Sequence, residues 1–157
     1  MPAQIRVKVT GVDKAVSDFH AIADRAVDPR PAFQEVGRDF LRVAASQFDR
    51  GGGTKPWAQL AASTVATKRR DNLDPRILVA TGRLKDSLAR AGGEHVERMT
   101  HALIEMGSSV PYFQAHQTGT WNGKRMTRLP KRPLVIPKRS QSEWRRFVRE
   151  YVVHGER

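Results

Sequence analysis

The first fifty residues show two hydrophobic periodicities in succession. In residues 4–10 every second side chain is apolar, which predicts a short strand with one buried face. From Val12 onward the apolar residues follow helical spacing, and Asp13 is placed to cap this helix before the proline-containing segment 28–31 ends it. A strand followed by a helix is therefore expected here.

The strongest amphipathic pattern follows that break. Apolar residues repeat at helical spacing from Phe33 to Phe48, Pro31 suits a position in the first turn, and three consecutive glycines at 51–53 terminate the helix. Residues 54–80 lack a sustained periodicity, so we predict a long loop that contains one short helix.

Shorter elements are predicted in the middle of the chain. Thr81 begins a capped helix in which Leu84 and Leu88 share one face. Residues 94–99 and 101–107 each have the composition and alternation of a strand. A tight turn between these two segments would join them as an antiparallel hairpin.

The last third of the chain is predicted to contain a helical turn, an edge strand and a final helix. Residues 111–117 form the turn, which ends before Gly119. The apolar triplet 134–136 lies between two prolines, and proline is confined to edge strands because it cannot donate to an interior ladder. The final helix, capped by Ser140 or Ser142, has an apolar stripe on one side and arginines on the other.

These elements predict the α+β class in a single domain. At 157 residues, 39% of them apolar, the chain suits one domain that spans residues 1–157. Helices and antiparallel strands interleave without the regular order of a parallel sheet, so we expect a small, mainly antiparallel sheet packed against several helices. The chain has no cysteine, no apolar run that could span a bilayer and no secretory signal, so assembly in the cytoplasm is expected.

Positive charge is concentrated near the C-terminus. The chain has 28 Lys and Arg against 16 Asp and Glu, a net charge of +12. Ten basic residues and one acidic residue lie between Lys124 and Arg149, within a basic loop and helix at 124–157. Such a patch attracts a polyanion or an acidic protein surface. The residues predicted to make that contact are Lys124, Arg125, Arg128, Lys131, Lys138 and Arg139.

Motifs for catalysis or metal binding are absent from the sequence. Residues 51–55 resemble a phosphate-binding loop only superficially, because they follow a helix and lack the Gly-Lys-Ser/Thr ending. The five histidines have no metal-binding spacing, and no serine lies in a nucleophile elbow. We therefore expect neither an enzyme nor a bound cofactor or metal. His116 is expected to pack or cap rather than to transfer protons.

The three tryptophans have different expected roles. Trp144 lies on the apolar stripe of the final helix, which predicts core packing, and Trp57 is expected to anchor a loop against the domain. Trp121 is expected to be exposed, either as a contact in an assembly or as an ordinary loop residue.

Four short phrases occur in a fixed order along the chain. They are Phe48 with residues 53–57 and Leu60; Thr64 and Lys68 followed by residues 77–78, 81–84 and Ser87; residues 112–119, which read Tyr-Phe-Gln-Ala-His-Gln-Thr-Gly; and residues 129–134 before the final helix. Each phrase is short, and the signal lies in their order and spacing. Together they resemble the phage virion morphogenesis family, the tail-completion proteins of Mu-like and related tailed phages, over roughly residues 33–152.

This resemblance implies a non-enzymatic virion protein at the head–tail junction of a tailed bacteriophage. It would act as a tail-completion or neck component, as one subunit of a ring through which DNA passes, and would assemble in the host cytoplasm. A ring subunit needs two different faces for its neighbours. Its partners would be copies of itself, a connector, tail terminator or tail tube protein and, under one hypothesis, packaged DNA, with no membrane. Structural or interface roles are assigned to Trp57, Thr81, Gly82, Tyr112, His116, Gly119, Arg132 and Pro133.

Two alternative functions remain open at the level of sequence. A basic DNA-binding protein would explain the local charge, although no helix-turn-helix or zinc module is recognisable. A hydrolase or nuclease would require a metal or an activated nucleophile.

Overall fold

The computed structural model describes residues 10–119 and 129–155 and places eight elements in them. The elements are α1 (Val12–Val27), α2 (Arg30–Arg50), α3 (Ala62–Arg70), α4 (Arg83–Ala89), β1 (His95–Met99), β2 (Ile104–Ser108), α5 (Phe113–Thr118) and α6 (Lys138–His154). The α+β class and the small antiparallel sheet are confirmed. The predicted strand 4–10 lies, apart from its last residue, outside the described ranges.

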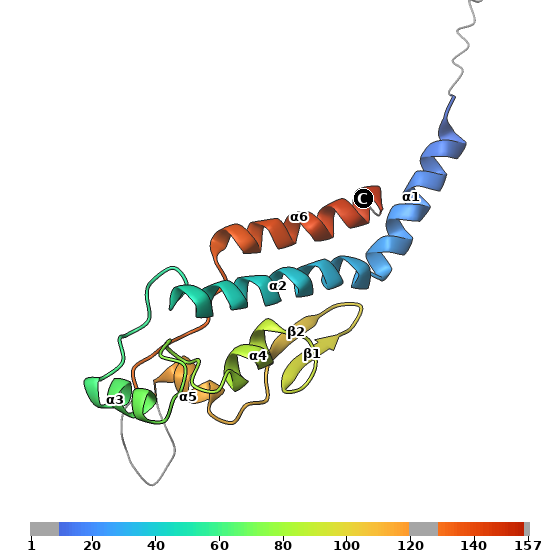
Figure 1. The fold of residues 1–157 in the computed structure, drawn as a ribbon. Helices are drawn as coiled ribbons and strands as arrows, with labels where there is room; N and C mark the ends of the chain where they lie inside the picture. The colour runs from blue at the N-terminus through green and yellow to red at the C-terminus, as the bar shows by residue number, and fades with distance from the viewer. Residues whose placement is uncertain (1–9, 120–128, 156–157) are drawn as a thin grey trace, which may run out of the picture.

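Helix α2 is the element against which the others pack. Figure 1 shows α6 running along one side of α2, with α4 and the hairpin on the other side. The predicted stripe of α2 faces this core, where Ala44 and Phe48 are buried, and Gly51 ends the helix in a left-handed conformation at φ 70°. The buried core cluster consists of Phe40, Ala44, Phe48, Trp57, Val79, Leu84, Leu88 and Val110.

The hairpin forms in the predicted place. Strands β1 and β2 pair antiparallel from His95 opposite Ser108 to Met99 opposite Ile104, and the backbone N–H of Thr100 donates to the carbonyl of Leu103 at 2.8 Å in the turn. The hairpin lies against α2 and α4. With only two strands it depends on that packing for its stability.

The edge strand predicted at 134–136 is wrong, because side chains satisfy the backbone groups that a strand would pair with another strand. The amide of Gln47 donates from Nε2 to the carbonyl of Val135 at 2.7 Å, and its Oε1 accepts the N–H of Val135 at 3.0 Å. The N–H of Leu134 donates to Oε1 of Gln117 at 3.1 Å. The segment is therefore extended but has no strand partner among the described residues.

Three helix caps differ from the sequence prediction, and the first is that of α4, where Gly82 rather than Thr81 is the cap residue. Helix α1 begins after Gly11, so Asp13 lies in its first turn rather than at its cap. Helix α6 begins at Lys138 after Pro137, which places Ser140 and Ser142 inside the helix. Ser142 Oγ instead donates to the carbonyl of Lys138 at 3.0 Å. Pro137 has the extended backbone of a residue just before a helix and takes the cap position. Helix α6 therefore begins before either serine.

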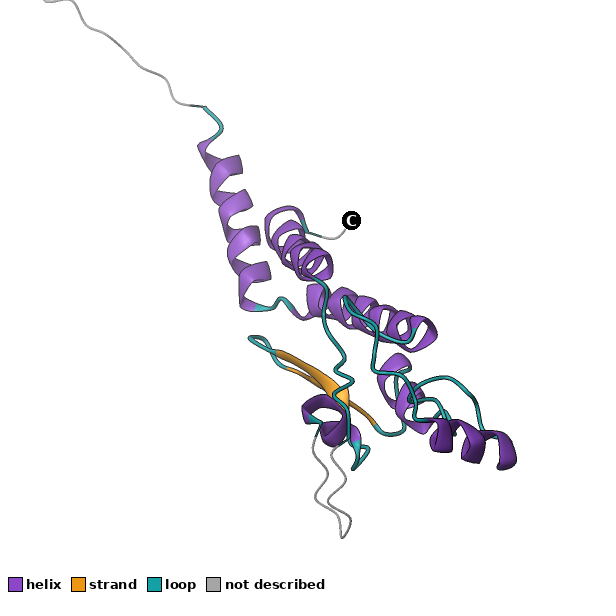
Figure 2. Cartoon of the chain, turned by 90° about the vertical axis from the view of Figure 1, so that its left-hand side faces the viewer, coloured by secondary structure: helices purple, strands orange, loops and turns teal. Residues whose placement is uncertain are grey.

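Helix α1 extends away from the rest of the molecule (Figure 2). It is held at its C-terminal end by Arg25, whose Nε and Nη2 donate to the carbonyls of Val152 and Val153 at 2.9 Å each. A guanidinium group at these last carbonyls of α6 complements the negative end of that helix. None of the helices within 10–119 and 129–155 is both long and apolar enough to cross a membrane.

Replacing Gln47 by leucine tests the link between α2 and the extended segment. Gln47→Leu introduces an apolar side chain of similar size and leaves both backbone groups of Val135 without their partner. We expect the free energy of unfolding to fall by about 1–3 kcal/mol, measured by urea denaturation. The exposed Gln114→Leu is the matched control and should change it little. Equal stabilities of the two variants would contradict the proposed role of Gln47.

Candidate functional site

Five of the eight residues assigned structural or interface roles line one open cavity of about 620 Å³: Thr81, Gly82, Tyr112, His116 and Arg132. The cavity lies where the loop before α3, the loop before α4, α5 and the segment 129–132 come together. Phrases that are up to seventy residues apart in sequence therefore meet at one place. We call this place the loop cluster.

Trp57 joins the loop after α2 to the segment that follows the loop cluster. It is 4% exposed, and its indole ring packs edge-on against Phe48 with 5.4 Å between the ring centroids. Its Nε1 donates to the carbonyl of Pro133 at 2.9 Å. Trp57 therefore anchors its loop, as expected, and the carbonyl of Pro133 accepts its hydrogen bond.

Arg132 performs a similar function with its guanidinium group. Its Nε and Nη2 donate to the carbonyls of Ala58 at 3.0 Å and Gln59 at 3.2 Å, and its backbone N–H donates to the carbonyl of His116 at 2.8 Å. The residue is 6% exposed, and this burial lowers the pKa of the guanidinium from its ordinary value. Arg132 therefore ties three parts of the cluster together while remaining a cation at its wall.

Lys68 is a second buried cation at the cavity, and sequence reasoning did not assign it a role. Its Nζ donates to the carbonyls of Asp74 at 2.8 Å and Arg76 at 2.7 Å, which fixes the loop after α3. Burial lowers the pKa of its ammonium group, while the nearby carboxylate of Asp74 opposes that shift. The described side-chain hydrogen bonds of Lys68 and Arg132 go to neutral carbonyl groups. These two side chains therefore give the cavity a positive wall.

His116 and Tyr112 lie together on α5. The two rings meet edge to face with 5.9 Å between their centroids, and Nδ1 of His116 is buried without a hydrogen-bond partner among the described residues. Burial, and secondly the charge of Arg132, lower the pKa of His116 below its ordinary 6.5. The imidazole is therefore neutral at pH 7, which agrees with the expected packing role.

The two glycines singled out by the sequence both have positive φ. Gly82 begins α4 at φ 82°, and Gly119 ends α5 at φ 79°. A side chain at Gly119 would be strained, and its Cβ would lie 2.7 Å from Cγ of Lys131 and 3.0 Å from the carbonyl of Leu129. Gly119 thus allows the segment after residue 128 to return close to α5.

The predicted basic contact residues are divided among different places. Lys124, Arg125 and Arg128 lie outside the described residues. Lys131 is exposed beside Gly119, whereas Lys138 and Arg139 are exposed in the first turn of α6, where Arg139 pairs with Glu143 at 3.0 Å. The described members therefore do not form one cluster with the cavity.

Two further residues that hold the fold were missed by the sequence analysis. Gln47 is fully buried, and the buried carboxylate of Asp39 accepts a hydrogen bond from Nε1 of Trp144 at 2.6 Å. The sequence could have indicated both, because Asp39 and Gln47 each lie three residues after an apolar residue of the α2 stripe and so share its buried face. Trp144 itself is half-buried against the core, as expected.

The lining of the cavity combines apolar and polar side chains. Within 10–119 and 129–155 no group of three or more His, Asp or Glu side chains is arranged to hold a metal ion. The cavity instead combines apolar walls with the side chains of Lys68, Arg132 and Tyr112. Such a surface suits a protein segment that carries an acidic or carbonyl group.

Protonation of His116 should weaken the folded state below pH 6.5. Because the pKa of His116 is lower in the folded state, the unfolded chain binds the proton first as the pH falls. His116 therefore does not affect the free energy of unfolding well above pH 6.5, and it lowers that free energy as the pH falls through this value. His116→Gln should remove this part of the pH dependence in urea denaturation. The exposed His101→Gln should follow the wild-type curve, and the same pH profile for wild type and His116→Gln would rule the effect out.

Comparison with known proteins gives one match. The model of the phage virion morphogenesis family matches residues 7–150, which includes α1 to α5 and most of α6. No curated protein and no solved structure matches the chain. The match covers most of the chain and extends closer to the N-terminus than the four phrases do. The chain therefore belongs to the phage virion morphogenesis family.

Proposed function

We propose that this protein is a tail-completion subunit at the head–tail junction of a tailed bacteriophage, and that it acts as one member of a ring. The observation that carries this proposal is the family match over residues 7–150, together with the convergence of the family's phrases in the loop cluster. Family membership supports a role in building the virion. The junction and the ring are our inference from it.

The loop cluster suits a contact with a neighbouring protein of the neck or tail. Its wall is held by hydrogen bonds from Lys68 and Arg132 to backbone carbonyls, so it is organised before a partner arrives. A preorganised surface loses little conformational entropy on binding. Thr81 is exposed at this cavity and is therefore placed to meet the partner. The function we propose is structural, with no catalytic step.

Deleting the gene from the phage tests the proposed role. We expect DNA-filled heads and separate tails in electron micrographs, and joined virions when the wild-type chain is supplied from a plasmid. Intact virions without the gene would overturn the proposal.

Point variants in the same complementation assay test the loop cluster. Thr81→Arg should fail to restore joining because it places a long cation in the cavity. Thr67→Arg, at an exposed position of α3 outside the cavity lining, should restore it. Both variants should keep the melting temperature of the wild type, since both positions are exposed.

A specific observation also supports contact with DNA. The ion pairs of α6 join Arg139 to Glu143 and Arg146 to Glu150, and neither Arg145 nor Arg149 takes part in one within the described residues. Arg145 and Arg149 are exposed one turn apart on the same face of α6. We propose that this arginine pair lies toward the DNA path or an acidic partner.

The salt dependence of DNA binding tests that orientation. The full chain should bind duplex DNA of arbitrary sequence at low salt, with an affinity that falls as salt rises. In Arg145→Glu/Arg149→Glu, the slope of log affinity against log salt should decrease in magnitude by about 2. The control Lys14→Glu/Arg98→Glu changes the net charge equally on other elements. The same loss of slope in the control would show that net charge alone is responsible.

A further inference from the structure

Helix α1 has an apolar face that nothing in the described structure covers. Val12, Val16 and Phe19 are 53%, 48% and 70% exposed, and their spacing places them on one side of the helix. Within the described part of the chain, no residue of α1 is buried. The contact with α6 uses a different side of the helix, that of Arg25. Contiguous exposed apolar surface of this kind marks an interaction site.

The size of α1 limits what can cover this face. A helix of 16 residues is about 24 Å long and about 10 Å wide, so half of its lateral surface is roughly 400 Å². A stable protein interface buries about 800 Å² on each partner. Two α1 helices lying side by side would remain well below that area. A groove that contacts α1 on both flanks buries more of its circumference, so a grooved surface suits this face better than a second α1 does.

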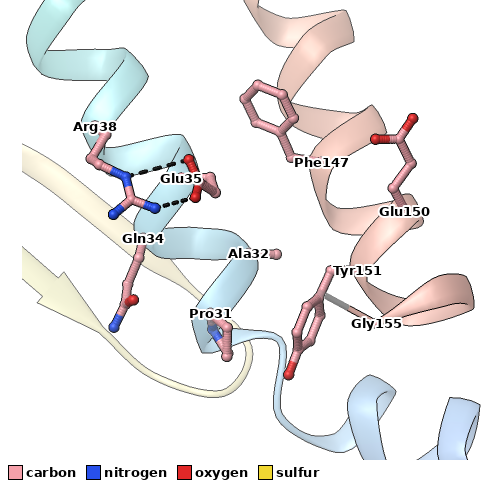
Figure 3. A pocket seen from close by; sticks show the side chains of 9 residues that line it. All are labelled: Pro31, Ala32, Gln34, Glu35, Arg38, Phe147, Glu150, Tyr151 and Gly155. Carbon is pink, nitrogen blue, oxygen red and sulfur yellow. Dashed lines mark hydrogen bonds and ion pairs between the residues drawn. The ribbon is translucent and has the colours of Figure 1, made fainter. Parts of the chain in front are cut away.

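Such a groove lies between α2 and α6, with a volume of about 440 Å³. Figure 3 shows Phe147 and Tyr151 projecting from α6 into the space between the two helices, with Ala32 and Pro31 on the side of α2. Its rim is polar and contains the ion pair of Arg38 with Glu35. An apolar floor with a polar rim is the usual composition of a protein interface.

Helix α1 cannot fill the groove of its own chain. Only residues 28 and 29 separate it from α2, and it leaves the end of the groove pointing away from the molecule (Figure 2). The apolar face of α1, which we call the arm, and the groove are therefore both open within the described residues. This is the arrangement of a head-to-tail interface, which closes into a ring when the rotation between copies is suitable.

Charge favours a second copy as the occupant. Helix α1 contains three aspartates against Lys14 and Arg25, so it is slightly acidic in a chain whose net charge is +12. The Lys14–Asp18 ion pair at 2.6 Å neutralises one aspartate on the outer part of α1, and Asp13 and Asp24 flank the apolar face. The groove itself is lined by Glu35 and Glu150 against Arg38, so the attraction acts at long range, between α1 and the strongly basic remainder of another copy, and the contact in the groove is apolar.

We propose that the apolar face of α1 docks into the α2–α6 groove of a second copy of this chain. The inference rests on the proposed ring function and deepens it, because it names the two faces by which neighbouring subunits join. Phe19 is the central anchor of the arm, and Phe147 and Tyr151 form the floor that receives it.

Engineered cysteines test this contact directly, because the natural chain has no cysteine. The double variant Phe19→Cys/Gln34→Cys, oxidised as the full-length purified protein, should give a ladder of disulfide-linked species larger than dimers. Each single variant should give at most a trace of dimer. Efficient dimer from Phe19→Cys alone would show symmetric α1 pairing and overturn the proposal, and so would the absence of any cross-linked species from the double variant.

A second variant gives an independent readout without cysteines. Phe19→Asp should weaken self-association at least roughly tenfold in sedimentation velocity, since it removes an interface anchor. Ser17→Asp adds the same charge at an exposed position of α1 outside the apolar face and should leave self-association unchanged. Equal effects of the two variants would contradict the proposed contact. Phe19 is exposed, so the thermal melt of the monomer should not change.

The outcomes separate this inference from the proposed function. If the wild-type chain rescues the gene deletion but the cysteine pair forms no ladder, the junction role stands and the docking of α1 is wrong. If the ladder forms but virions assemble without the gene, the docking stands and the proposed junction role is wrong.

Discussion

The fold depends on how an extended segment is held without a sheet. Residues 129–137 have no strand partner among the described residues, so their backbone groups need other hydrogen-bond partners. Gln47 supplies both a donor and an acceptor to Val135, and Trp57 donates to the carbonyl of Pro133. Arg132 lies in the same segment and donates in the opposite direction, to the loop after α2. The segment thereby connects α2, the long loop and α5 into one body.

The loop cluster is a consequence of this arrangement. The hydrogen bonds by which Arg132 holds the extended segment also place it at the wall of the cavity, and Lys68 is fixed there by its own bonds to carbonyls of the loop after α3. The site is therefore rigid where it touches the core and open where Thr81 lies. The side chains that hold this site together are therefore the same ones that line the cavity.

The distribution of stability suits a subunit that is completed by assembly. The core around α2 is well packed, whereas α1 has no buried residue within the described part of the chain and is fixed mainly at its C-terminal end by Arg25. The cost of exposing Phe19 is recovered only when another surface covers it. Net positive charge repels copies from one another in general. A slightly acidic arm offers a specific contact against that repulsion.

The sequence by itself determined the elements whose signal is local. The stripe of α2, the glycine stop after it, the hairpin and the apolar face of α6 were all predicted, because periodicity and turn chemistry act over a few residues. The order of the four phrases also identified the family. Only the tertiary structure decided that 134–136 is no strand and that Gln47 and Lys68 are buried, because each of these depends on partners far away in the sequence. It also decided that Thr81, His116 and Arg132 meet at one place and that the face of α1 stays open, since local patterns show which face is apolar but not what covers it.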